Sequence, residues 1–135
     1  MSSEAPVLNT MGAFGGGWAL PLTCRWLALT RAQVGGDRTL IATNGARSGL
    51  DVVRFLLAGA SAVQMTSAVM TGGFGVVSRS IGELDAYLDA RHQVAADLVG
   101  RAADRLEAYT DQPFDEDRWT RFVVPESRPQ AATEA

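Results

Sequence analysis

LIATNGARSGLDVVRFLLAGASAVQ, residues 40–64, decides the fold of this chain. The short apolar run at 39–43 is bounded by turn residues, which predicts a buried strand. Ser48 can cap a following helix, because Asp51 stands three residues later as in a capping box. Residues 62–65 predict a second buried strand. Strands separated by one helix need a crossover connection, so the stretch predicts two parallel strands with the helix on the outer face of their sheet.

The segments on either side of this unit add loops and helices. Upstream, the glycine-rich segment 12–17 is expected to be a loop, and the spacing of apolar residues predicts a helix over 18–33. Downstream, the same kind of spacing predicts helices over 76–91 and 94–109. The run PVLN at 6–9 offers one further short strand. The order of elements is therefore typical of an α/β protein.

Composition excludes several classes of function. All 12 basic residues are arginine, so no lysine is present to form a Schiff base. The net charge is −3 and the arginines do not cluster, so nucleic-acid and anionic-membrane partners are not expected. Cys24 is the only cysteine and His92 the only histidine, which argues against a disulfide and a metal site. The sequence has neither a signal peptide nor a long apolar run, so we expect a cytoplasmic protein. We expect His92 to lie at the surface or at a helix end.

The predicted sheet is incomplete. Two parallel strands leave both outer edges with unpaired backbone groups, and their two faces are apolar and need cover. No internal repeat of the strand-helix unit supplies further strands. We therefore expect the missing strands to come from another chain, so that the protein is an obligate hetero-oligomer. The aromatic residues Trp119 and Phe122, which follow an acidic stretch, are candidates for docking on that partner.

Three blocks of this sequence resemble the C-terminal part of the dihydroorotate dehydrogenase and dihydropyrimidine dehydrogenase superfamily of FMN-dependent (β/α)8 barrels. They are GAFGGGWALPLTCR, LIATNGARSGLDVVRFLLAGASAVQ and QMTSAVM. In order, they look like the GGxSG loop with its helix, the seventh strand with its glycine loop and helix, and the eighth strand with its turn. The resemblance implies a partial (β/α)8 (TIM) barrel, made of the last two or three β/α units plus extra C-terminal helices and completed by another chain.

The resemblance also implies which residues bind a cofactor. In that family, the loops after the last strands hold the FMN phosphate with backbone N–H groups, aided by a helix N-terminus. Carried over by position, the phosphate contacts are Gly16, Asn44, Gly45, Thr66 and Ser67. Two of these depart from the family's glycines: asparagine tolerates a positive φ, whereas β-branched Thr66 requires either an ordinary φ or a shifted loop. Asn9 resembles an asparagine of the family that helps to hold a pyrimidine-like substrate.

On this resemblance the chain divides into four parts. Residues 1–17 form an N-terminal segment with the glycine loop, and residues 18–92 form the barrel units with their phosphate-binding loops. Residues 93–124 add a helix and a docking segment, and residues 125–135 are expected to be disordered. The family's flavin-ring lysine and its Ser or Cys acid–base group lie on earlier strands, so no catalytic residue is expected in this chain.

The sequence thus predicts the small subunit of a split FMN-dependent oxidoreductase. The resemblance implies that a large subunit supplies the other strands and the catalytic residues, and that the reaction is hydride transfer at a C–C bond beside a carbonyl or amide. An alternative is a non-catalytic structural or regulatory subunit that has lost the cofactor. A third is that the sequence is a piece of a longer enzyme. Gly45→Val is expected to abolish flavin retention and to leave the two subunits associated.

Overall fold

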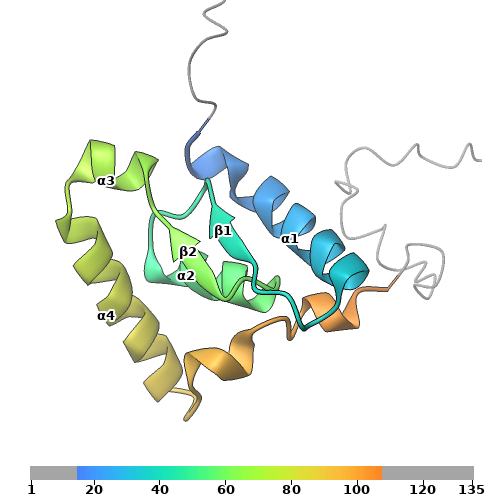
Figure 1. The fold of residues 1–135 in the computed structure, drawn as a ribbon. Coiled ribbons are helices and arrows are strands. Elements are labelled where there is room, and N and C mark those ends of the chain that lie inside the picture. The colour runs from blue at the N-terminus through green and yellow to red at the C-terminus, as the bar shows by residue number, and fades with distance from the viewer. Residues whose placement is uncertain (1–14, 108–135) are drawn as a thin grey trace, which may run out of the picture.

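The computed structural model describes residues 15–107 and contains one parallel β-α-β unit with helices around it (Figure 1). β1 and β2 pair in parallel, with Ile41 opposite Ala62 and Thr43 opposite Gln64. The predicted crossover is therefore confirmed. In chain order the elements are η1 (Gly17–Ala19), α1 (Leu20–Val34), β1 (Ile41–Thr43), α2 (Gly49–Leu57), β2 (Ala62–Gln64), α3 (Ser67–Gly72), α4 (Gly75–Asp89), η2 (Ala95–Leu98) and η3 (Ala103–Arg105).

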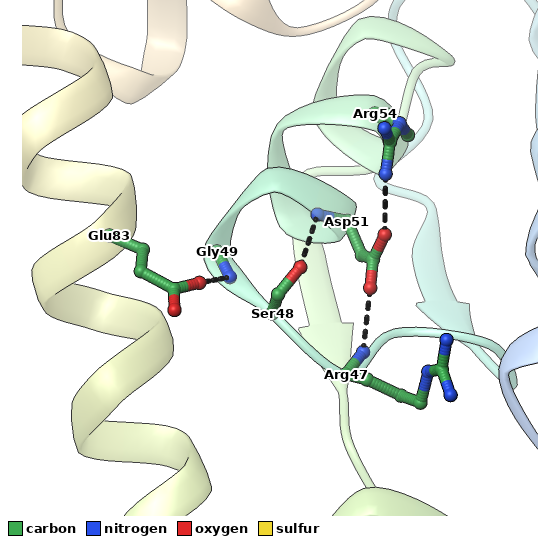
Figure 2. A network of polar contacts seen from close by, with 6 residues as sticks. All are labelled: Arg47, Ser48, Gly49, Asp51, Arg54 and Glu83. Atoms are coloured by element: carbon green, nitrogen blue, oxygen red, sulfur yellow. Dashed lines mark hydrogen bonds and ion pairs between the residues drawn. The ribbon is translucent and has the colours of Figure 1, made fainter.

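Side chains of this chain cap the N-terminus of α2 (Figure 2). The hydroxyl of Ser48 accepts a hydrogen bond from the Asp51 N–H at 3.3 Å, as the sequence predicts. The Asp51 carboxylate accepts one from the Arg47 N–H at 3.0 Å. From α4, the Glu83 carboxylate accepts the Gly49 N–H at 2.7 Å. These carboxylates complement the positive end of the helix dipole, so this helix N-terminus is occupied from within the chain.

α2 lies between two hydrophobic clusters. The first cluster joins α1, β1 and α2, and its buried members are Leu27, Ala42, Ala46, Phe55, Ala58 and Ala60. The second joins α2, α4 and η2 through Val53, Leu56, Leu88 and Leu98. Because residues of α2 face both clusters, this helix holds the described part of the chain together.

Only one face of the sheet is covered by the described residues. Ala42 is fully buried, whereas its neighbours Ile41 and Thr43 are exposed, as are Ala62 and Gln64 opposite them. The expectation that both strands are buried is therefore wrong for residues 15–107. Successive residues of a strand point to opposite faces, and α1 and α2 pack on only one of them.

The helix predicted over 94–109 is wrong as far as the described residues reach. The chain forms two short 3-10 turns, η2 and η3, around Gly100, whose φ is 78°. The Gly100 N–H donates to the Leu56 carbonyl at 2.8 Å, and the Ala102 N–H to the Leu57 carbonyl at 3.0 Å. These bonds satisfy carbonyls at the C-terminal end of α2, a tertiary requirement that overrides the local periodicity.

Other differences are small. α1 begins at Leu20 after a 3-10 turn, and α3 was not predicted. His92 is exposed just beyond α4, which confirms its predicted position at a helix end. Among residues 15–107, no helix combines the length and the apolar character that crossing a bilayer requires. The predicted strand at 6–9, Asn9 and the tail at 125–135 lie outside the described residues.

Candidate functional site

Three segments that are far apart in the sequence converge on one open concavity of about 500 Å³. They are the loop at 15–17, the end of β1 with its loop at 43–47, and the end of β2 with α3 at 64–71. The concavity therefore lies at the carboxyl ends of both parallel strands. All five residues that the sequence predicts as phosphate contacts line it, namely Gly16, Asn44, Gly45, Thr66 and Ser67.

Asn44 ties the first two segments together. Its φ is 74°, so the asparagine does adopt the positive φ that the sequence requires at this position. Its side-chain oxygen accepts the Gly16 N–H at 3.1 Å. Its carbonyl accepts the hydroxyl of Thr23, which lies in α1, at 2.8 Å. The end of β1 is thereby fixed against both the glycine loop and α1.

Gly45 must be glycine because of α1. Its φ is 120°, and a Cβ built on it would lie 2.6 Å from the Cα and 2.7 Å from the nitrogen of Leu20. Both atoms belong to the backbone of the first turn of α1 and cannot move aside cheaply. A side chain at position 45 would therefore disturb the packing of α1 as well as the loop. We no longer expect Gly45→Val to leave the assembly intact.

Thr66 and Ser67 start the third segment. Thr66 has a φ of −93° and a ψ of −64°, an ordinary conformation for a β-branched residue, so the first of the two alternatives for this position holds. Ser67 is the first residue of α3 and is exposed. A Cβ on Gly15 would lie 2.8 Å from the Ser67 hydroxyl oxygen. A glycine at position 15 thus leaves room for this hydroxyl at the concavity.

The described lining is suited to an anion. It contains no aspartate or glutamate, and its one charged side chain is Arg47. Arg47 is exposed, and a Cβ on Gly17 would touch its guanidinium. Figure 2 shows the Arg47 side chain extending away from Asp51, whose carboxylate accepts the Arg47 backbone N–H and pairs with the Arg54 guanidinium. Glycine backbone, hydroxyl groups and a guanidinium together form a donor set typical of phosphate sites.

Other kinds of chemistry find little support in this part of the chain. The residues that line the concavity include no lysine, histidine, cysteine or carboxylate that could transfer a proton. Within 15–107, no three His, Cys, Asp or Glu side chains are grouped to hold a metal ion. Cys24 is partly buried away from this concavity, and its burial raises the pKa of its thiol, so it is not an activated nucleophile.

Among the lining residues outside the predicted five, Gly15 and Arg47 bear most on anion binding, and sequence reasoning weighed Arg47 as a phosphate partner against a solvated arginine. Gly15 belongs to the glycine run at 12–17, and only the position of the Ser67 hydroxyl explains why a glycine is needed there. Arg47 follows the second loop directly, which was a usable signal, but an arginine at a helix start is usually solvated. Its neighbour Gly17 comes from a distant segment, and that proximity is visible only in the fold.

Comparison with known proteins identifies relatives. The model of the dihydroorotate dehydrogenase family matches residues 1–88. The catalytic subunit of dihydroorotate dehydrogenase B (NAD(+)) from Thermoplasma acidophilum is 31% identical over 102 residues, which cover 74% of this chain and 33% of that protein. The corresponding subunit from Methanopyrus kandleri is 34% identical over 79 residues, 58% of this chain and 25% of that protein. This chain therefore spans a third or less of these relatives.

Solved structures give the same result for the fold. Dihydroorotate dehydrogenase from Eimeria tenella in complex with ferulenol superposes with a TM-score of 0.61 at 25% identity, over 69% of this chain and 24% of that one. The ligand-free form from the same organism gives a TM-score of 0.62 at 21% identity, over 74% and 30%. The described residues are thus an α/β fragment that matches part of a TIM barrel.

Proposed function

Because the chain belongs to the dihydroorotate dehydrogenase family, whose members are flavin-dependent oxidoreductases, we propose that it is the small subunit of a split enzyme of the dihydroorotate or dihydropyrimidine dehydrogenase type. In this proposal the chain closes the barrel and binds the FMN phosphate. A large subunit supplies the other β/α units, the contacts to the flavin ring and the catalytic residues. FMN, when bound, supplies the ring that accepts a hydride from the substrate.

One observation carries the proposal: the three segments singled out from the sequence meet at one concavity whose described lining is free of carboxylates. Such a site has the right charge for a phosphate and no group that repels it. The Ser67 hydroxyl and the Arg47 guanidinium are its side-chain donors. Gly15 keeps space open beside the first of these donors. The chain's own part in the chemistry is therefore to hold and orient the cofactor.

What the described residues lack supports a division of labour between two subunits. The concavity has no side chain that could move a proton at neutral pH, so the proton must be transferred by a residue elsewhere. Among the described residues, each strand has a neighbour on one side only, and one face of the sheet is open. A partner that adds strands would cover this face and bring the missing group.

One contact favours the rival function, a structural or regulatory subunit without cofactor. The Gly16 N–H, one of the amides expected to hold the phosphate, already donates to the Asn44 side chain. If the other loop amides were engaged in the same way, the concavity would keep its shape and lose its affinity for anions. The two functions differ in whether the assembled protein contains flavin.

The test uses the full chain, tagged and isolated together with its bound partner from the cells that make it. We expect the complex to show the two visible absorption bands of oxidised flavin and to release equimolar FMN when it is denatured. A complex with Ser67→Ala serves as the matched control and should release less FMN. If the wild-type complex is colourless and takes up no added FMN, the rival function is correct.

A further inference from the structure

Two exposed apolar stripes flank the two strands. The first lies on α1 and consists of Leu22 and Trp26, which are 50% and 63% exposed. Positions four apart share one face of a helix, and the opposite face of α1 packs Leu27 into the first cluster. A tryptophan exposed to this degree beside a leucine is typical of the centre of a protein interface. We call these two residues the α1 stripe.

The second stripe runs from α3 onto α4. Met70, Phe74 and Ile81 are 81%, 84% and 55% exposed, and Val77 between them is also exposed. Val77 and Ile81, four residues apart, share one face of α4, while Met70 lies on α3 and Phe74 at the junction of the two helices. Val76 and Leu88 are buried, so α4 has both a covered and an uncovered apolar side. We call the four exposed residues the α3–α4 stripe.

The α3–α4 stripe continues into a slot between β2 and α4. Val77 and Ile81 line this cavity of about 340 Å³ together with Met65 and Ala62 of the β2 segment. Ser80 also lines it, and its hydroxyl is buried with no hydrogen-bond partner among the described residues. A buried hydroxyl normally has a partner, so packing beside the slot is incomplete. The uncovered apolar residues of the slot are those of an interface whose other half is missing.

The helices that carry the two stripes lie on opposite sides of the strand pair (Figure 1), with α1 next to β1 and with α3 and α4 on the side of β2. This inference rests on the proposed function. We infer that a single partner binds both stripes at once. The partner is a chain of five or six β/α units whose first and last helices present apolar faces. The described residues match 24–30% of the solved barrels, so the part that closes the ring is the larger one. The ring of a TIM barrel must reach both open edges.

A second copy of this chain is the competing occupant. Copies could place the α1 stripe of one against the α3–α4 stripe of the next and so form a ring. Such a ring would contain no lysine at all, and no acid–base group among the described lining residues. It would leave the proposed hydride chemistry without a proton donor. The partner is therefore a different chain.

The test compares charged substitutions in each stripe with one outside both. Trp26→Glu probes the α1 stripe and Phe74→Glu probes the α3–α4 stripe. Val94→Glu is the matched control, because Val94 is 61% exposed and belongs to neither stripe. Each tagged full chain is co-expressed with the partner found in the wild-type complex, and binding is measured by titration and analytical ultracentrifugation. We expect each stripe variant to weaken the complex by roughly tenfold or more, the pair together to abolish it, and the control to match wild type.

Neutral substitutions guard against misfolding. Trp26→Gln and Phe74→Gln should also weaken binding, but by less than the corresponding glutamate variants. The protection of the α2 amides from hydrogen exchange should stay at the wild-type level. Unchanged binding for either stripe overturns the inference, since one partner would then hold only one side. A partner without β/α units, or a wild-type chain that closes into a ring of copies, overturns it too. A colourless complex whose partner is a different chain of β/α units, and which still needs both stripes, refutes the proposed function and leaves this inference standing.

Discussion

Gly15 and Ser67 offer a test of the phosphate site at the level of single atoms. A methyl group on Gly15 would lie 2.8 Å from the Ser67 hydroxyl oxygen, and among described residues other than its chain neighbours the only further atom within 4 Å is the Asn44 side-chain oxygen at 3.5 Å. Gly15→Ala should therefore displace the hydroxyl and little else. If this hydroxyl bonds the phosphate, losing the bond costs about 1.5–3 kcal/mol because the acceptor is charged. FMN affinity should then fall about 10- to 150-fold.

The double variant sharpens the test. Ser67→Ala removes the hydroxyl oxygen that the methyl group of Gly15→Ala would displace. Adding Gly15→Ala to Ser67→Ala should therefore cause no further loss of FMN affinity. The two losses are thus expected to be strongly non-additive. The assay titrates the flavin-free complex with FMN and, as a control, with riboflavin, following the quenching of flavin fluorescence. Additive losses, or equal losses for riboflavin, which has no phosphate, would refute the assignment of Ser67 as a phosphate ligand.

Two further predictions concern stability, measured by urea unfolding of the full chain in its complex. Gly49→Ala should lower the free energy of unfolding by about 1–3 kcal/mol, because its Cβ would lie 2.7 Å from the Leu84 nitrogen in α4. Gly82→Ala should be neutral or stabilising, because apart from its chain neighbours and the backbone of α4 no described residue has an atom within 4 Å of the added Cβ. The Arg31 guanidinium holds the pKa of the Asp104 carboxyl below its usual 3.8. The pair therefore stabilises the fold above about pH 4, and this stabilisation is lost as the pH falls further. In Asp104→Asn, the free energy of unfolding should depend less on pH below about pH 4.

Sequence could predict the β-α-β unit because its signals are local. The Ser48 cap and the Asn44 turn depend on residues within a few positions of one another, and both occur as predicted. The helix over 94–109 failed for the opposite reason. Its backbone bonds to carbonyls of α2 some forty residues away, around Gly100. No local pattern carries that information.

The candidate site was predictable in its members and not in its geometry. Resemblance placed Gly16, Asn44 and Ser67 in three loops, and the fold brings these loops to one concavity. It could not show that the Asn44 side chain takes up the Gly16 N–H. Nor could it show that Gly45 is constrained mainly by α1. Both facts depend on how α1 and the loops at 15–17 and 43–47 pack against one another, which is set by tertiary contacts.

The bonds between α2 and the segment around Gly100 affect how the chain folds as it is made. The family model matches residues 1–88, and beyond that match Leu98 is a buried member of the second cluster, and Arg31 pairs with Asp104, 73 positions later. A nascent chain that has only reached residue 88 still has the carbonyls of Leu56 and Leu57 without these partners. The unit therefore has its full set of these contacts only after Asp104 has left the ribosome. Until then the two stripes and the open sheet face are displayed on an unfinished core, so a partner or chaperone that meets the chain early would meet it in this state.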